Sequence, residues 1–477
     1  MKRLSAFLFC LSLGLSLQAK VTLPPFFSDN MVLQQKADVA LWGTSDKGKK
    51  VTVAPSWTRK KYSATPDAEG KFFLRIPTPE AGGPYTISFS DGEKTVLDNV
   101  LLGEVWFCGG QSNMEMYMRG FEGQPVEHGA EYILSASPRT PIRICNLPNV
   151  KAARPQAIKK AVWKENCPEA VALTSAVAWF FASRLHQVLD VPVGLLIADW
   201  GGSAIEAWMP RELLDKEFPG EFNLAQLDTA DISGLKGKDP CIHYNGMISA
   251  LHPFTFKGML WYQGENNRPR PEQYTRLQVA YVKMMRERFQ NPEAPFYFVQ
   301  IAPYPYGKYG RLFTNGYFNE AQQKTLELIP HSGMVTTADI GSFYTVHPPK
   351  KKEVGDRLAA LALVNDYGVG GINPVAPTFE SVEFNGSEAV VSFRTDKLGL
   401  SPRMTPLEGF ELAGEDRVFH PATGIADMNR VTVTSPEVPS PVAVRYCFRN
   451  WCMGTLFNSY GIPAAPFRTD SWDDLRE

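Results

Sequence analysis

The clearest arrangement of reactive residues in the sequence lies in one glycine-rich turn, Gly109-Gly110-Gln111-Ser112-Asn113. The turn follows an apolar run, Val105–Cys108, that is typical of a buried strand, and it precedes residues that can begin a helix at Glu115. A serine on such a turn has its hydroxyl exposed at the end of a sheet, beside backbone amides that can stabilise an oxyanion. Ser112 is therefore a candidate nucleophile, although an ordinary loop of small residues would have the same composition.

Three further segments carry polar or glycine-rich residues at the ends of expected strands. These segments are Asp199-Trp200-Gly201-Gly202-Ser203, Trp261-Tyr262-Gln263-Gly264-Glu265-Asn266, and 339–348, which begins at Asp339 and ends in His347-Pro348. Because the carboxyl ends of parallel strands meet at one edge of a sheet, we expect all four segments to converge there.

The residue types at this edge fit acyl transfer. A serine hydroxyl is a weak nucleophile without a base, and His347 is the best placed of the seven histidines because it follows a strand and precedes a helix. A glycine at Gly201 or Gly202 lets a backbone amide approach a ligand without obstruction by a Cβ atom. Gln263 offers a side-chain amide to an oxyanion. The combination is specific, whereas each part alone is common.

The region from 101 to 370 must position these residues. Expected strands alternate in it with expected helices, which predicts an α/β fold with a mostly parallel sheet and helices on both faces. The expected strands are 105–108, 193–198, 258–262, 296–301 and 334–338, and the expected helices are 175–189, 271–289, 318–329 and 350–365.

Two regions of β character flank the central one. Residues 20–100 and 371–477 contain short apolar runs separated by Gly, Pro, Asp and Asn turns, which predicts an N-terminal and a C-terminal β-sandwich-like domain. A chain of 477 residues is long enough for about three domains.

The N-terminus and the overall charge indicate where the protein acts. Lys2-Arg3, an apolar stretch over 6–17 and a small residue at Ala19 predict a signal peptide over 1–19, and hence a periplasmic or secreted protein. With 49 basic and 50 acidic residues, the sequence shows no basic stripe for nucleic acid, and no later run is long enough to span a membrane. Export permits a disulfide, for which Cys447 and Cys452 are close enough in sequence.

Several motifs together resemble the sialate O-acetylesterase family, within the SGNH hydrolase group of carbohydrate esterases. The matching segments, in order along the chain, are Phe27–Gln35, Gly103–Trp106, Gly110–Met116, Trp200–Ser203, Ile205–Trp208, Tyr244–Ile248, Trp261–Glu265, His347-Pro348, Val354-Gly355, Arg357–Ala359 and Pro466–Asp470. The resemblance covers nearly the whole chain after the expected signal peptide, and it implies an SGNH, flavodoxin-like sheet.

The resemblance also implies a mechanism. Ser112 would attack an acetyl ester, with His347 as general base and then as the acid for the sugar alkoxide. The amides of Ser112 and of Gly201 or Gly202, with the side chain of Gln263, would form the oxyanion hole. An acetyl-enzyme would form and be hydrolysed by water, and neither a metal nor an organic cofactor would be needed.

The sequence departs from the family pattern at two positions. The family commonly carries an acidic residue two positions before the histidine, where this chain has Thr345. In a serine protease, loss of the orienting acid costs on the order of 10⁴ in kcat. We expect a Ser–His dyad, with Asp339 or Glu265 as alternative orienting carboxylates. The second departure is Asp199, where relatives tend to have serine; Asp199 and Asn113 are further candidates for orienting the site or contacting substrate.

Three functions therefore compete. The first is an exported esterase for O-acetylated sugars, in particular a sialate 9-O-acetylesterase; the second is an acetylxylan or other polysaccharide acetylesterase. The third is an inactive glycan-binding protein, which only Thr345 supports. A sialate carboxylate would need a cation, for which Arg119, Arg268, Arg270 and Arg311 are candidates. The tyrosine-rich loop 304–311 could form a sugar-binding rim.

Overall fold

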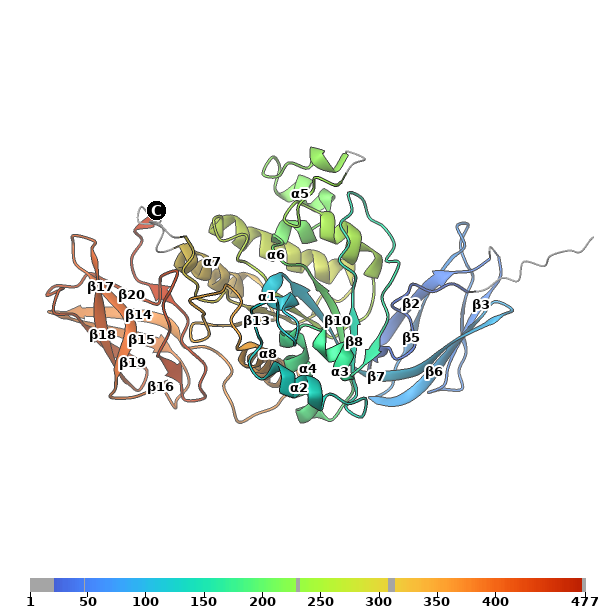
Figure 1. Cartoon of the computed structure of the whole chain (residues 1–477), viewed down its shortest axis with the longest axis horizontal. Helices are drawn as coiled ribbons and strands as arrows, with labels where there is room; N and C mark the ends of the chain where they lie inside the picture. The colour runs from blue at the N-terminus through green and yellow to red at the C-terminus, as the bar shows by residue number, and fades with distance from the viewer. Residues whose placement is uncertain (1–20, 47, 229–231, 308–313, 474–477) are drawn as a thin grey trace, which may run out of the picture.

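The computed structural model describes residues 21–46, 48–228, 232–307 and 314–473, arranged as a central α/β region between two β regions (Figure 1). The predicted signal peptide, 1–19, lies outside the described residues. No helix among the described residues is long and apolar enough to cross a membrane.

The central region is built on a parallel sheet, as the sequence predicts. Its strands are β7 (Lys94–Gly110), β8 (Ile142–Asn146), β10 (Val193–Asp199), β11 (Gly258–Tyr262), β12 (Phe296–Val299) and β13 (Ser332–Val335), with β9 (Lys164–Glu165) antiparallel at one edge. The strands lie in the order β9-β8-β10-β7-β11-β12-β13. Apart from β8 and β9, this is the 2-1-3-4-5 order of flavodoxin, whose ligand binds where the strand order reverses. Here that point lies at β7 and β11.

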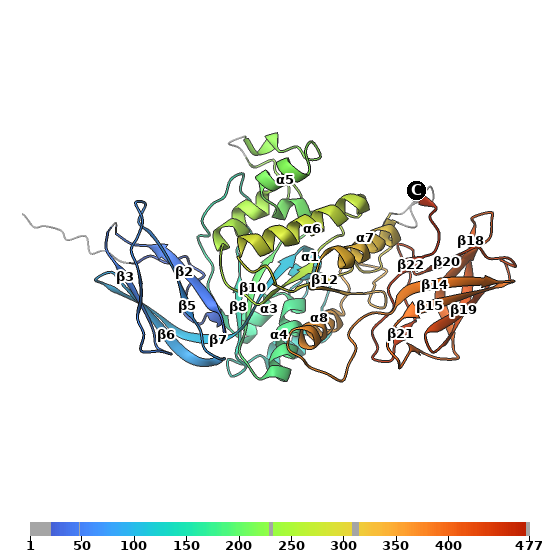
Figure 2. The ribbon, with the colours of Figure 1, turned by 180° about the vertical axis from the view of Figure 1, so that it is seen from behind.

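Helices cover both faces of this sheet (Figure 2). The α-helices of this region are α1 (Ser112–Glu115), α2 (Gly129–Ser135), α3 (Pro168–Ala172), α4 (Ala176–Leu189), α5 (Arg211–Glu217), α6 (Pro271–Arg288), α7 (Thr314–Leu328) and α8 (Lys351–Asn365). The helices α4 and α8 pack on one face, and α6 and α7 pack on the other. Ser175 caps α4 by accepting a hydrogen bond from the Ala178 amide, and Gly355 lets α8 approach Phe180 of α4 closely. A side chain at 355 would have to displace that contact.

The N-terminal β region contains β1 (Val32–Gln34), β2 (Asp38–Thr44), β3 (Val51–Pro55), β4 (Tyr62–Ala64), β5 (Lys71–Pro77) and β6 (Gly82–Ser90). It joins the central sheet through β7, a single strand of 17 residues. The first half of β7 pairs with β6, and its second half lies between β10 and β11. The expected strand at 105–108 is therefore only the end of a longer one.

The C-terminal region is a second sheet with its own apolar core. It contains β14 (Thr378–Asn385), β15 (Glu388–Arg394), β17 (Pro406–Ala413), β18 (Phe419–Asp427), β19 (Arg430–Thr434), β20 (Ala443–Tyr446) and β22 (Phe467–Arg468), with the short pair β16 (Leu400–Ser401) and β21 (Phe457–Asn458) beside it. Turn residues such as Gly409 and Pro421 interrupt the apolar alternation in β17 and β18, so the pattern of short apolar runs does not mark these two strands. The Sγ atoms of Cys447 and Cys452 lie 3.0 Å apart as free thiols, so the expected proximity is confirmed and their oxidation stays a prediction.

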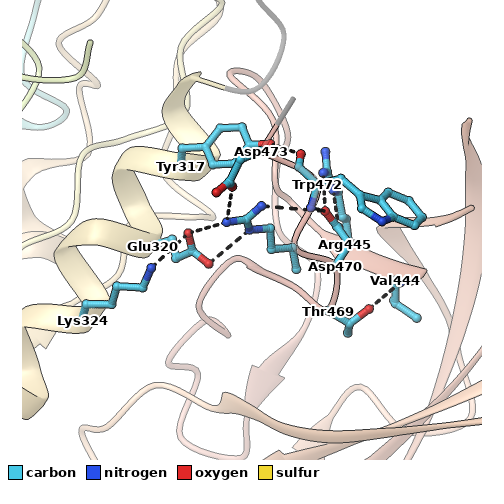
Figure 3. A network of polar contacts seen from close by, with 10 residues as sticks. Tyr317, Glu320, Lys324, Val444, Arg445, Thr469, Asp470, Trp472 and Asp473 are labelled. Carbon is cyan, nitrogen blue, oxygen red and sulfur yellow. Dashed lines mark hydrogen bonds and ion pairs between the residues drawn. The ribbon is translucent and has the colours of Figure 1, made fainter. Parts of the chain in front are cut away.

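Ion pairs attach the C-terminal region to α7 (Figure 3). Arg468 donates to both carboxylate oxygens of Glu320, at 3.2 and 3.1 Å, and also pairs with Asp473. Behind them, Arg445 and Asp470 form a fully buried bidentate pair. Because a buried charge left alone is costly, this pair requires both partners to be present.

Candidate active site

The nucleophile turn is tied to the two strand ends beside it. Gly110, the last residue of β7, is opposite Asp199 of β10 and Tyr262 of β11 in the parallel ladder. The Trp200 amide donates to the Gly110 carbonyl at 3.1 Å, and the Gln111 amide donates to the Tyr262 carbonyl at 3.0 Å. Gly110 has a φ of +152°, and a Cβ atom there would clash with the Tyr262 carbonyl. The turn therefore requires glycine at this position.

Ser112 lies half-buried at the start of α1, which ends after Glu115. The expectation that a helix continues beyond Glu115 is wrong, because the backbone of Met116 is already non-helical. Among the described residues, none accepts a hydrogen bond from the backbone amides of Ser112 and Gly202. Both amides are thus available as oxyanion donors.

The Gly201 amide has a partner already. It donates to Glu115 Oε2 at 2.5 Å, and a Cβ atom on Gly201 would come within 3.5 Å of the Ser112 Cβ atom. Gly201 therefore lies beside the serine, as predicted, but a carboxylate competes for its amide. Asp199 lies next to this carboxylate, and burial followed by the charge of Glu115 raises the pKa of Asp199 well above its usual range.

Gln263 is fully buried, and its side chain braces the loop after β11. Its Nε2 atom donates to Gln111, to the Ser203 carbonyl and to Asn267, at 3.2, 3.1 and 2.7 Å. These bonds tie its buried amide to Gln111, the residue before Ser112, so its part in the oxyanion hole stays a prediction. Asn266, which sequence reasoning did not single out, is only partly buried, and its Nδ2 atom donates to the Gly202 carbonyl at 2.7 Å.

Asn113 joins the nucleophile turn to the histidine loop. Its Nδ2 atom donates to the Val346 carbonyl at 3.0 Å and to Glu265 at 2.5 Å, while its Oδ1 atom accepts from Lys351 at 2.5 Å. Asn113 is 1% exposed, so it supports the site from within and does not face substrate. Burial raises the pKa of Glu265 and lowers the pKa of Lys351 to about 7.

His347 follows Val346, whose carbonyl accepts the hydrogen bond from Asn113. The ring of His347 contacts Gln124, which is not one of the carboxylates predicted to orient it. The Nδ1 atom is 2.7 Å from Oε1 of Gln124, and the Thr345 hydroxyl donates to the same oxygen. Burial, and after it the nearby Lys351 ammonium, lowers the pKa of His347 to about 4. Within the described residues there is no hydrogen bond between His347 and Ser112; such bonds are often long in enzymes without substrate.

The carboxylates expected to orient His347 have other partners. Asp339 forms a bidentate pair with Arg357, at 2.8 and 2.7 Å, and Glu265 accepts from Asn113. Strand β13 ends at Val335, not at Ala338 as predicted, so Asp339 lies in the loop that leads to His347. Asp199 has the charge of Glu115 near it, and no hydrogen bond joins it to His347 among the described residues.

The arginines proposed for a sialate carboxylate are in different environments. Arg270 pairs with Glu206 at 2.7 Å, and Arg268 stacks on the ring of Tyr306. Arg119 is exposed and lies over the ring of Tyr117, close to the nucleophile turn. Arg311 lies outside the described residues.

The edge formed by β7, β10 and β11 carries a serine turn that Asn113 joins to a histidine loop, an arrangement typical of esterases of the α/β class. The chain belongs to the carbohydrate esterase family of sialic acid-specific acetylesterases, whose family model matches residues 102–363. It is thus a carboxylic ester hydrolase of the sialate O-acetylesterase-like kind.

Relatives with known names agree with this assignment. The chain is 24% identical to a sialate O-acetylesterase from Mus musculus over 519 residues, covering 93% of each chain. It is 24% identical to a sialate O-acetylesterase from Homo sapiens over 401 residues, covering 75% of this chain and 73% of the human one. A solved structure, described as a novel carbohydrate acetylesterase from Xanthomonas citri, is 34% identical with a TM-score of 0.85, covering 95% of this chain and all of that one.

Proposed function

We propose that this protein is an exported serine esterase of the SGNH type that removes acetyl groups from sugars, with Ser112 as nucleophile and His347 as general base. The observation that carries the proposal is the 3.0 Å hydrogen bond from Asn113 to the Val346 carbonyl, because it joins the neighbours of both residues. Intact Ser112 and His347 argue against the inactive glycan-binding alternative.

The reaction proceeds in two halves. His347 Nε2 takes the proton of the Ser112 hydroxyl as its oxygen attacks the acetyl carbonyl, and the resulting tetrahedral intermediate collapses with transfer of that proton to the departing sugar oxygen. Water then attacks the acetyl-enzyme, with His347 again taking the proton, and acetate leaves as the Ser112 hydroxyl is restored. No metal or cofactor takes part in these steps.

The oxyanion is stabilised by donors that surround Ser112. The Ser112 and Gly202 amides are available, and the partly exposed side chain of Asn266 supplies a third donor in place of the buried Gln263. The Gly201 amide joins them only when Glu115 releases it.

Sialic acid acetylated at the 9-position is the first candidate substrate, since the curated relatives are named sialate O-acetylesterases. Its carboxylate requires a cation, and Arg119 is the described arginine that is both exposed and near the nucleophile turn. We expect Arg119→Gln to raise KM for this substrate and to leave p-nitrophenyl acetate hydrolysis unchanged.

An aromatic surface favours a polysaccharide as the second candidate. Phe343 and Tyr344, 54% and 93% exposed, lie on the loop that carries His347, and Phe343 packs edge-on against Trp451 of the C-terminal region, with ring centroids 5.5 Å apart. Flat apolar rings in water beside an esterase site suit the faces of sugar rings along a chain. The tyrosines at 304 and 306 pack against one another, and Tyr306 also packs against Arg268; residues 308–311 of the predicted rim lie outside the described residues.

The function is tested by acetate release from 9-O-acetylated sialic acid, acetylated xylan and p-nitrophenyl acetate. We expect activity on all three to depend on Ser112, and the Tyr344→Ala variant to lose activity on acetylated xylan only if a polysaccharide is the substrate. A folded protein without activity on any ester beyond the Ser112→Ala background would support the glycan-binding alternative instead. Export is tested by N-terminal sequencing of the secreted or periplasmic protein, which should begin near Lys20.

A further inference from the structure

The geometry points to Gln124 as the positioning residue of the catalytic histidine: its neutral carboxamide oxygen takes the place that an acid has in a Ser–His–acid triad. The inference rests on the proposed function. It adds to Ser112 and His347 a third residue, which comes from a different loop. The Oε1 atom of Gln124 lies 2.7 Å from the Nδ1 atom of His347.

The hydrogen bond determines which ring nitrogen carries the proton. A carboxamide oxygen only accepts, so Nδ1 must donate, and Nε2 keeps the lone pair that a general base needs. The Thr345 hydroxyl supports this orientation of the amide, because its oxygen accepts from the His347 amide at 3.1 Å and its hydrogen is given to Gln124. Thr345, at the position where the family has an acid, thus acts by fixing Gln124.

The loop that carries Gln124 is shaped to hold it there. Phe121 and Gln124 exchange two backbone hydrogen bonds of 3.0 Å, and Gly120 has a φ of +81° at a point where a Cβ atom would clash with the Gln124 carbonyl. The Phe121 ring packs edge-on against His347, with centroids 5.3 Å apart. The Glu127 amide also donates to the Pro349 carbonyl at 3.0 Å, so the two loops are joined on both sides of the histidine.

A neutral partner has a different electrostatic effect from a carboxylate. It orients the ring but places no negative charge beside the imidazolium that forms during catalysis. The Lys351 ammonium from α8 acts on the ring of His347, and Lys351 is in turn bound to Asn113, which also donates to Glu265 of the loop after β11. Burial, and after it the Lys351 ammonium, opposes protonation of His347 and keeps its pKa at about 4.

The test compares Gln124→Met and Gln124→Glu by the pH dependence of kcat and KM for acetate release from p-nitrophenyl acetate. Methionine fills a similar volume without accepting a strong hydrogen bond, and we expect kcat to fall about 10- to 100-fold with KM nearly unchanged. Glutamate restores an acceptor with a negative charge, so we expect more activity than in the methionine variant. We also expect the acidic limb of kcat/KM to move to higher pH by about one unit or more.

Controls separate this inference from the proposed function. Gln187→Met makes the same change at an exposed position on α4 and should leave kcat and the pH profile as they are. If Ser112→Ala remains active, the proposed function fails; if it is inactive but Gln124→Met keeps the kcat and pH profile of the parent, only the role of Gln124 is overturned. A glutamate variant that folds, by its circular dichroism and Tm, but shows no shift of the acidic limb also overturns it.

Discussion

The two halves of the candidate active site are held in different ways. The nucleophile side is fixed by the sheet: Gly110 is in register with both neighbouring strands, and Gln111 accepts hydrogen bonds from Gln263 and Gly264 of the loop after β11. The base side is a loop after β13, and His347 is held there by Gln124, Thr345 and the bridge from Asn113.

This difference teaches where the sequence can change without loss of the fold. Backbone pairing in a parallel sheet depends little on side chains, so the nucleophile turn can be recognised from its glycines and its position. A loop can instead take its supporting groups from any segment that reaches it. The replacement of the family acid by Thr345 is accordingly compensated from the separate loop at Gln124.

Removal of either reacting group should have the largest effect on kcat. The effect should be equally severe whether the residue belongs to the nucleophile side or to the base side. We expect Ser112→Ala and His347→Ala each to lower kcat by at least about 10⁴-fold, and the double variant to lose little more because the two residues act as a unit. Acetate release from p-nitrophenyl acetate measures this. Losses that multiply in the double variant would instead mean that the residues act independently.

The oxyanion donors test the nucleophile side by itself. Asn266→Ala should lower kcat by about 10²- to 10³-fold with little loss of stability, because it removes a donor at the surface of the site. Gln263→Ala should chiefly lower Tm, because it removes three buried hydrogen bonds, to Gln111, Asn267 and the Ser203 carbonyl. Thermal denaturation beside steady-state kinetics distinguishes the two, and the reverse pattern would return the oxyanion role to Gln263.

The bridge between the two sides is tested at Asn113. We expect Asn113→Ala to lower kcat about 10- to 100-fold and to cost roughly 2–3 kcal/mol of stability, since it leaves Glu265 and Lys351 without their shared partner. Asn166→Ala is a matched control, because Asn166 is also 1% exposed, donates to a loop carbonyl, that of Ser137, and accepts a hydrogen bond from the side chain of Trp179. Equal losses of kcat in the two variants would contradict the claim that Asn113 couples the two sides.

The pH dependence gives the smallest effect and reports on the base side. The base is neutral His347, whose pKa is lowered to about 4, so kcat/KM should be nearly constant between pH 5 and 7 and fall only as the pH drops through about 4. The free energy of unfolding should change with pH in the same direction. The unfolded chain protonates His347 from about pH 6.5 downward and the folded protein only near pH 4, so the contribution of His347 to stability is lost as the pH falls toward 4. An acidic limb near pH 6.5 would contradict this prediction, because it would mean that His347 has the pKa of an unperturbed histidine.

Much of this arrangement could be predicted from local sequence, and the remainder depended on tertiary contacts. The strands that carry the site, the capping of α4 by Ser175 and the convergence of four distant segments all follow from periodicity, turn residues and the rule for parallel sheets. No pattern could indicate that Glu115 occupies the Gly201 amide or that Gln263 is buried, because both depend on side chains packed across separate loops. Gln124 lies 223 positions from His347 in an otherwise ordinary loop, and the only signal for it was the missing acid at Thr345.

The most direct test of the account is to identify the residue that becomes covalently modified. The protein is treated with diisopropyl fluorophosphate, a reagent for activated serines, and the adduct is located by peptide mass spectrometry while residual esterase activity is followed. The account predicts a single adduct on Ser112, loss of activity in proportion to labelling, and no adduct in the His347→Ala variant. Full activity after complete labelling of Ser112, or inactivation with the adduct on another residue, would contradict it.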